Sequence, residues 1–298
     1  MITGNVPGHL IAGAKAGFLQ AVRSVTPLWQ QIASTMNLDG KTTELVDLGS
    51  APMPTNSKTG VTIQDFIEKR LTVTPLDWDI TVWISHNAMQ DDRIGDLDRR
   101  VRSAGENFNL HMNSLVFKVL NAGDTTTYGY CYDGTTFFSN SHADSGAKYA
   151  TGQDNLNGLA LSLDNFETVY VAQSTRLDDQ GEYMGIVPNV LVVPPALERL
   201  AAQIALNREA YDTANRETNP YAGRMTYVVA PWLDSTAWML LSTTENVKPL
   251  TLVMREQPNL QHTWFDATAP DGGRYYFKFY ARYNAAYGDW RLGTMGNT

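Results

Sequence analysis

The chain has 298 residues, 43% of them hydrophobic and 18% charged, with a formal net charge of −8. This length allows one large or two ordinary domains, and the negative charge argues against a chain that binds nucleic acid over its whole surface. Cys131 is the only cysteine, which excludes an intrachain disulfide and a cysteine-rich metal site and fits folding in a reducing cytoplasm.

The first 38 residues predict two short helices. Apolar residues at helical spacing run from Leu10 to Val25 and are interrupted by Gly13 and Gly17, and the segment LWQQIASTM follows Pro27. Such a start is typical of an arm that docks on another molecule. The alternative is an ordinary N-terminal helix on the chain's own core.

Residues 40–68 are polar and rich in turn formers, with Lys58 in a plausible loop tip. A long stretch without a core pattern is usually functional or projecting. Residues 69–85 then predict strand, because apolar and polar residues alternate strictly from Leu76 to Ile84.

One long amphipathic helix is predicted from Asp91 to Gly123. Its apolar stripe includes Phe108 and Leu115, and acids crowd its first turns, where they suit the helix dipole. A helix of about 45–50 Å is long for a protein of this size, so we expect it to brace other elements. We expect Asp91 and Asp92 to cap its start.

A hairpin around Asp133-Gly134 is predicted next. Residues 160–245 then predict a separate α/β lobe, in which a helix begins after Ser162 and an apolar strand spans Val190–Val193. The lobe's further elements are a helix after Pro195, a strand at 226–230 and a strand at 238–241. Long alternating strands near residues 250–255 and 275–283 close the chain, and we expect them to lie across the long helix.

No catalytic signature, nucleotide-binding loop or zinc motif is present. His142 and Asp144 could supply two metal ligands from one loop, but nothing nearby completes a site, so a polar loop histidine is expected. Asp178 and Asp179 are explained by turn chemistry, and Cys131 by an idle thiol. We therefore predict no catalytic, cofactor-binding or metal residues. No apolar run reaches the roughly 18 residues of a membrane span, and no signal peptide is evident.

Several short motifs, taken in order, resemble the major capsid proteins of tailed bacteriophages and, among them, the Mu-like major head subunit family. The similarity extends from about Leu10 to Gly293. The motifs are HNAMQDDRIG at 86–95, CYDG with FF at 131–138, VVPPALE at 192–198, VAPWL at 229–233, KPL at 248–250 and ARYNAAYGDW at 281–290.

This resemblance implies an α+β fold of the Hong Kong 97 type and a protein that is not an enzyme. The implied parts are an N-terminal arm (1–45), an extended E-loop (46–84), a P-domain (85–150) whose spine helix spans about 92–122, an α/β A-domain (151–245), and closing P-domain strands with the C-terminus (246–298). It implies assembly into hexamers and pentamers that form an icosahedral shell around double-stranded DNA.

The implied partners are other copies of the chain, with portal, scaffold or decoration proteins and weak nonspecific contacts to packaged DNA, but no membrane and no cofactor. The implied location is the virion, assembled in the host bacterial cytoplasm. We expect residues 1–38 and the part of the E-loop from about Leu48 to Phe66 to make most of their contacts with other copies, and Lys58 to be the candidate for any covalent crosslink.

Two other functions stay open from the residues alone. One is a hydrolase that uses the region of Asp178, Asp179 and His142. The other is a nucleic-acid-binding module that uses the basic C-terminal strand, where Lys278 and Arg282 alternate with aromatic residues.

Overall fold

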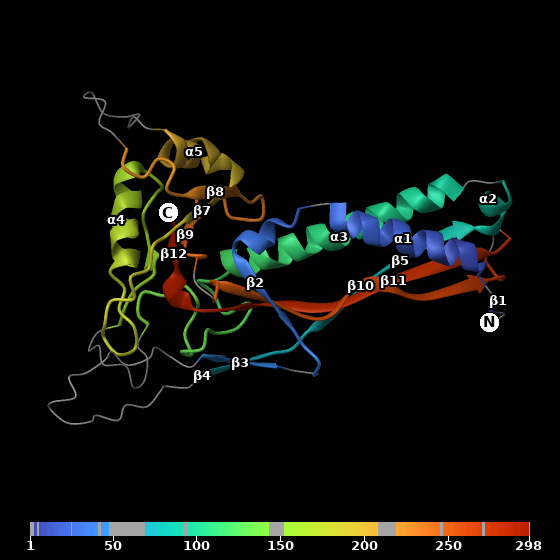
Figure 1. Ribbon diagram of the computed structural model, residues 1–298, viewed down its shortest axis with the longest axis horizontal. Helices are drawn as coiled ribbons and strands as arrows, with labels where there is room; N and C mark the ends of the chain where they lie inside the picture. The colour runs from blue at the N-terminus through green and yellow to red at the C-terminus, as the bar shows by residue number, and fades with distance from the viewer. Residues whose placement is uncertain are drawn as a thin grey trace.

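The computed structural model describes residues 3–4, 6–24, 26–40, 43–47, 69–91, 94–142, 152–207, 219–244, 247–269 and 272–297. These residues form a long rod, in which helices lie on a sheet, and a lobe at one end of the rod (Figure 1). Across the described ranges, none of the helices combines the length and apolarity of a membrane span.

Helix α3 (Ile94–Asn121) runs along the rod and is the predicted long helix. It begins three residues later than predicted, because strand β5 (Leu76–Ser85) leads first into a short helix α2 (His86–Gln90), whose Ala88 amide donates to the Ser85 hydroxyl at 3.2 Å. Asp91 ends α2 rather than capping α3, so that expectation is wrong, and Asp92 lies outside the described residues.

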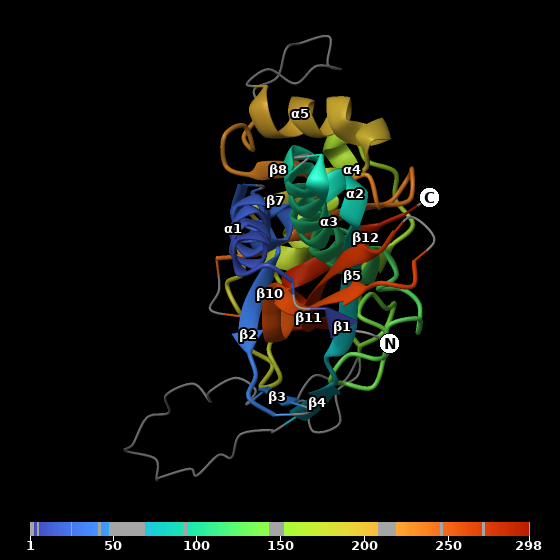
Figure 2. The same ribbon diagram turned by 90° about the vertical axis from the view of Figure 1, so that its right-hand side faces the viewer.

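The sheet of the rod has the strand order β1 (Thr3–Gly4), β10 (Leu250–Asp266), β11 (Arg274–Tyr287) and β5, with β2 (Ala33–Asn37) parallel to β10. Figure 2 shows α1 and α3 on one face of this sheet. Alternate residues of β11 fill that face, where Phe277, Phe279, Ala281 and Tyr283 are fully buried. The predicted packing of the closing strands across the long helix is therefore confirmed.

Helix α1 (Gly8–Ser24) packs on α3 within the same chain, so the prediction that residues 1–38 bind mainly other copies is wrong for the described part of this segment. Phe18 is fully buried and stacks on Phe279, with ring centroids 4.1 Å apart. Gly105 of α3 lets the two helices approach closely, because a side chain there would collide with the Phe18 carbonyl. The ordinary N-terminal helix, left open as the alternative, is the observed one.

The prediction for the segment after α1 is correct for its first part and wrong for its second. Leu28–Gln31 forms a short 3-10 helix (η1), but the next residues form strand β2 and not helix. Asn113 of α3 fixes this junction, because its side-chain oxygen accepts the Trp29 amide at 3.0 Å, and Asn109 donates to the Val22 carbonyl at 3.1 Å.

Replacing Asn113 by alanine is expected to lower the free energy of unfolding by about 1–3 kcal/mol, because the buried Trp29 amide loses its acceptor. Urea unfolding of the dissociated chain measures this change. The matched control is Asn107→Ala on the exposed side of the same helix, for which we expect less than about 0.5 kcal/mol. Equal losses of unfolding free energy at the two positions would contradict the role of Asn113 as the acceptor of the Trp29 amide.

Strands β3 (Thr43–Asp47) and β4 (Lys69–Val73) form a two-stranded ribbon beside the rod. Val73 at its base packs with Val253 and Ala286 of the sheet. Residues 48–68, with Lys58 and the predicted loop tip, lie outside the described residues.

The lobe is built on a second sheet with the order β6 (Leu156–Asn157), β12 (Gly293–Gly296), β9 (Trp238–Leu241), β7 (Val190–Val193) and β8 (Thr226–Val229). Helices α4 (Leu163–Ser174) and α5 (Glu198–Leu206), the latter preceded by a 3-10 turn (η3, Pro195–Leu197), belong to this lobe. Val192 and Met239 join the core of the rod, whereas Leu191 and Leu240 join a second core. The predicted strands and the Ser162 cap are confirmed.

One local prediction fails, and one strand was not predicted. The turn at Asp133-Gly134 is present, with Gly134 at φ 80°, but the residues on either side form loops and not a hairpin. Strand β12, which was not predicted, follows the 3-10 turn η4 (Trp290–Leu292) and is completely buried between β6 and β9. Its sequence GTMG has neither length nor apolar alternation, so its burial depends on the tertiary structure.

Candidate functional site

His142, which the sequence analysis considered as a metal ligand, lies in a group of buried side chains where the rod joins the lobe. We call this group the junction cluster. It consists of Asp133, His142, Asn155, Arg176 and Trp290, which come from the loop after α3, the approach to β6, the end of α4 and η4. His142, Asn155 and Trp290 are fully buried. The expected polar loop histidine is therefore a core residue.

His142 is held on every side. Its ring stacks on Trp290 with centroids 3.9 Å apart and planes 2° apart. Nδ1 lies 2.5 Å from Asp133 Oδ2, and Nε2 lies 3.0 Å from Asn155 Oδ1. A side chain with both ring nitrogens bonded and no exposed surface cannot reach a substrate.

The hydrogen bonds fix the orientation of the His142 ring. The Asn155 amide nitrogen donates to the carbonyls of Phe137 and Trp290, at 2.8 and 3.2 Å, so its oxygen is the atom that faces Nε2. That oxygen and an ionised carboxylate can only accept. Both ring nitrogens of His142 therefore face acceptor atoms, and Nδ1 makes the contact with Asp133.

Asp133 is ionised. Burial alone would raise the pKa of this carboxyl, but hydrogen bonds from His142 and Thr135 outweigh it and hold the pKa below its ordinary value. Both side chains of the pair have no exposed surface. Removing one partner of a buried, fully hydrogen-bonded ion pair strongly destabilises the folded state, even where the pair adds little net stability.

Arg176 joins the lobe to the end of the chain. Its guanidinium donates to the carbonyls of Arg291 and Gly293, at 2.7 and 2.9 Å, and to the Thr294 hydroxyl at 2.7 Å. Burial lowers its pKa to about 10, which still leaves it charged at neutral pH. This residue fastens β12, a strand without apolar alternation, into the lobe sheet.

The hydrolase alternative receives no support from these positions. Asp178 accepts the amides of Gln180 and Glu182, at 2.9 and 2.8 Å, which is the predicted turn chemistry. Asp178 and Asp179 are 7% and 1% exposed, and His142 is fully enclosed, so the three do not line an open cleft. Cys131 is buried, which raises the pKa of its thiol. Within the described part of the chain, no three metal-ligating side chains come together, and Asp144 lies outside it.

His111 on α3 is a histidine whose side chain makes local contacts. Its Nδ1 lies 2.7 Å from the Tyr283 hydroxyl and its ring packs on Trp78 at 4.3 Å. Burial, with a contribution from Lys118, lowers its pKa. It is half-buried rather than fully buried.

The basic strand does not form the exposed cationic surface that nucleic-acid binding requires. Lys278 and Arg282 of β11 pair with Asp79 and Asp77 of β5, with nitrogen–oxygen distances of 3.6 and 2.5 Å. These pairs neutralise Lys278 and Arg282: Arg282 lies directly opposite Asp77, and Lys278 reaches Asp79 diagonally across the two strands.

Sequence reasoning missed Asn155, Arg176 and Trp290. Only Trp290 carried a signal, as part of the ARYNAAYGDW motif. The other two are ordinary polar residues whose burial follows from contacts far apart in the chain. The geometry of the junction cluster is that of a structural clamp between rod and lobe, and any function must therefore lie in the chain's shape and surfaces.

A family model described as phage capsid protein matches residues 68–294. Among solved structures, the capsid of bacteriophage JBD30 is 18% identical, covering 78% of this chain and 100% of that chain, with a TM-score of 0.57. The mature capsid of bacteriophage PhiM1 is 8% identical over 92% of this chain and 87% of that chain, with a TM-score of 0.57. A virus-like particle from Pyrococcus furiosus is 11% identical over 96% and 99% of the two chains, with a TM-score of 0.56.

None of the curated proteins has a sequence that matches this chain significantly. The TM-scores establish that the chain shares the fold of these solved structures, although the sequence identities are low. The family match covers more than half of the residues and includes α3, strands β5, β10 and β11 of the rod sheet, and most of the lobe. The chain therefore belongs to the phage capsid protein family, and it has the Hong Kong 97-type fold.

Proposed function

We propose that this chain assembles with copies of itself into hexamers and pentamers, which close an icosahedral shell around double-stranded DNA. The observation that carries the proposal is the rod: a 28-residue helix lies on strands of 17 and 14 residues, and the rod ends in a lobe (Figure 1). A rigid, elongated subunit carries load along its length and presents long sides to its neighbours. Interfaces in such assemblies bury thousands of Å².

The parts of the chain receive corresponding roles in this proposal. Residues 85–150 and 246–298 form the P-domain around the spine helix α3, and residues 151–245 form the A-domain. Residues 46–84 form the E-loop, of which the described β3–β4 ribbon and β5 are the base. Residues 1–45 are the N-terminal segment, but its helix α1 is a fixed part of the rod. The short motifs at 86–95 and 281–290 support the further proposal that the chain is of the Mu-like type.

The partners follow from the same role. A related JBD30 capsid is decorated with minor capsid protein trimers, and we propose that decoration, portal or scaffold proteins bind this shell too. Contacts with DNA would be few and nonspecific, because a wall of negatively charged subunits repels phosphates and lets DNA move. Assembly would take place in the host bacterial cytoplasm, with the mature protein in the virion and without enzymatic activity.

Sedimentation of the purified chain tests this proposal. We expect most of the protein in fast-sedimenting particles that appear as closed shells by negative-stain electron microscopy, with ring-shaped capsomers as the slower species. A chain that remains monomeric over a range of protein and salt concentrations would contradict the proposal.

A further inference from the structure

Strand β5 lies at the edge of the rod sheet. It pairs with β11 over all ten of its residues without a register shift, and no described strand pairs with its other side. A free edge presents a row of unpaired amide and carbonyl groups, which natural proteins normally protect. Residues 76–85 contain neither a proline nor a bulge.

One hydrogen bond identifies the groups that point outward. Arg100 of α3 donates to the Trp83 carbonyl at 2.7 Å, so this carbonyl faces away from β11. In an antiparallel ladder, residues with outward main-chain groups alternate along the strand. The outward groups of β5 are therefore those of Asp77, Asp79, Thr81 and Trp83.

Charge does not protect this edge. Asp77 and Asp79 could repel an approaching strand, but both are engaged in the ion pairs with Arg282 and Lys278. Trp83, 36% exposed, lies with its ring 4.0 Å from the Arg274 guanidinium carbon and 5.2 Å from that of Arg100. The edge is thus electrically balanced and carries an exposed aromatic residue, as protein interfaces often do.

A groove runs beside the edge, between β5 and α3. It has a volume of about 330 Å³ and is lined by Ile80, Thr81, Val82, Trp83, Arg100, Ser103, Ala104 and Asn107. A second hollow of about 400 Å³, formed by Asp96, Arg99, Arg100 and Ser103, lies next to it. Apolar residues (Ile80, Val82 and Ala104) and polar residues (Thr81, Arg100 and Ser103) both line the first groove, which suits alternate side chains of an extended strand.

We infer that the free edge of β5 and this groove receive an extended strand from a second copy of this chain. The incoming strand would pair with the main chain of Asp79 and Thr81 and with the Trp83 amide, since the Trp83 carbonyl already accepts Arg100. It would place alternate side chains between β5 and α3, which is β-augmentation. The inference rests on the proposed function, which supplies copies at high local concentration. A nucleic acid has no peptide groups to continue the ladder, and the neutralised acids and bases offer it no net charge.

A proline at Thr81 tests the main-chain pairing. Thr81→Pro removes an outward amide but no ladder bond to β11, since proline is tolerated where the amide of an edge strand faces outward. We expect the yield of sedimenting particles to fall at least tenfold, while circular dichroism of the dissociated chain is unchanged. Thr81→Val, which keeps the amide, should assemble like the original chain.

Filling the groove is a second test that leaves β5 intact. Ser103→Trp would occupy the space of the incoming side chains, whereas Glu106→Trp is also exposed on α3 but lies outside the lining of both hollows. We expect only Ser103→Trp to reduce assembly. Normal assembly of both Thr81→Pro and Ser103→Trp would overturn the inference and leave the proposed function standing.

A photo-crosslinker at position 81 of assembled particles identifies the occupant. We expect mass spectrometry to find a crosslink to a peptide of a second copy. A crosslink only within the same chain, or only to DNA, would contradict the inference. An original chain that never assembles would contradict the proposed function together with the inference.

Discussion

Replacing Trp290 by alanine is expected to lower the free energy of unfolding by about 3–5 kcal/mol. Trp290 is fully buried, and its ring stacks on His142 and lies within 5.7 Å of the guanidinium carbons of Arg176 and Arg291. The truncation leaves a cavity where the loop after α3, the lobe and the C-terminal strand β12 meet. Because the lost support also releases β12, we expect the lobe to open first.

Urea unfolding of dissociated subunits, followed by hydrogen exchange, measures both effects. Exchange should rise in β9 and β12 before it rises in β10 and β11. The control is Tyr183→Ala, at a side chain that is 69% exposed, for which we expect less than about 0.5 kcal/mol. A uniform rise in exchange over rod and lobe would contradict the local role of Trp290.

Replacing Asp133 by asparagine is the second large change, with an expected loss of about 3–5 kcal/mol at pH 7, because it removes the buried carboxylate that the enclosed His142 ring contacts. The matched control is Asp79→Asn, which breaks the ion pair with Lys278, in which the two side chains are 52% and 34% exposed. Such a surface pair contributes at most about 1 kcal/mol. Equal losses in the two variants would contradict the assignment of a buried ion pair.

The stability of the Asp133→Asn variant is expected to depend on pH differently from that of the original chain. The folded chain lowers the pKa of Asp133 below the ordinary value of about 3.9, so the folded state binds the proton less readily than the unfolded state. The stabilisation is therefore complete above about pH 4 and is lost as the pH falls through the folded pKa. We expect Asp133→Asn to flatten the acid side of the stability–pH curve. An unchanged acid slope would contradict this.

Much of the fold could be predicted because local patterns decided it. The stripe from Ile94 to Ala122 predicted α3, and the alternation from Leu76 to Ile84 predicted β5, since each element buries one continuous face. The short motifs, taken in order, then indicated the protein family. The error over Asp91 arose because a capping serine at the strand end begins a separate helix first.

The remaining features depend on contacts that a local pattern cannot contain. Strand β12 is polar and glycine-rich, and it is a strand only because β6 and β9 lie on either side and Arg176 binds its first two residues, Gly293 and Thr294. The N-terminal stripe from Leu10 to Phe18 fitted an arm as well as a core helix. The close approach of α1 to Gly105, which lies far away in the sequence, makes this stripe part of a core helix.

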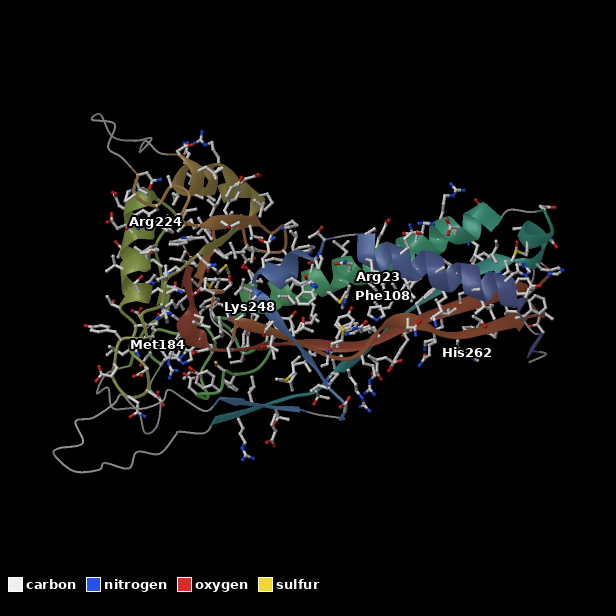
Figure 3. The ribbon with its side chains drawn as sticks, in the orientation of Figure 1. Arg23, Phe108, Met184, Arg224, Lys248 and His262 are labelled. Atoms are coloured by element: carbon white, nitrogen blue, oxygen red, sulfur yellow. The ribbon has the colours of Figure 1, made fainter. Side chains whose placement is uncertain are left out.

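Figure 3 shows the side chains along the rod, with Phe108 between α3 and the sheet and His262 on the side of β10 that faces away from α1. Phe108 is 2% exposed and its ring meets Phe18 edge-on at 5.7 Å. The apolar stripe of α3 is thus covered by the chain's own α1 and strands. Contacts between copies must therefore use other surfaces, such as the β5 edge.

A cryo-electron microscopy reconstruction of particles formed by the purified chain tests the central claim most directly. The account predicts a closed icosahedral shell with hexamers and pentamers of this chain, in which α3 and the β10–β11 strands lie within the wall. Particles without such order, or a chain that gives only monomers at every concentration, would contradict it.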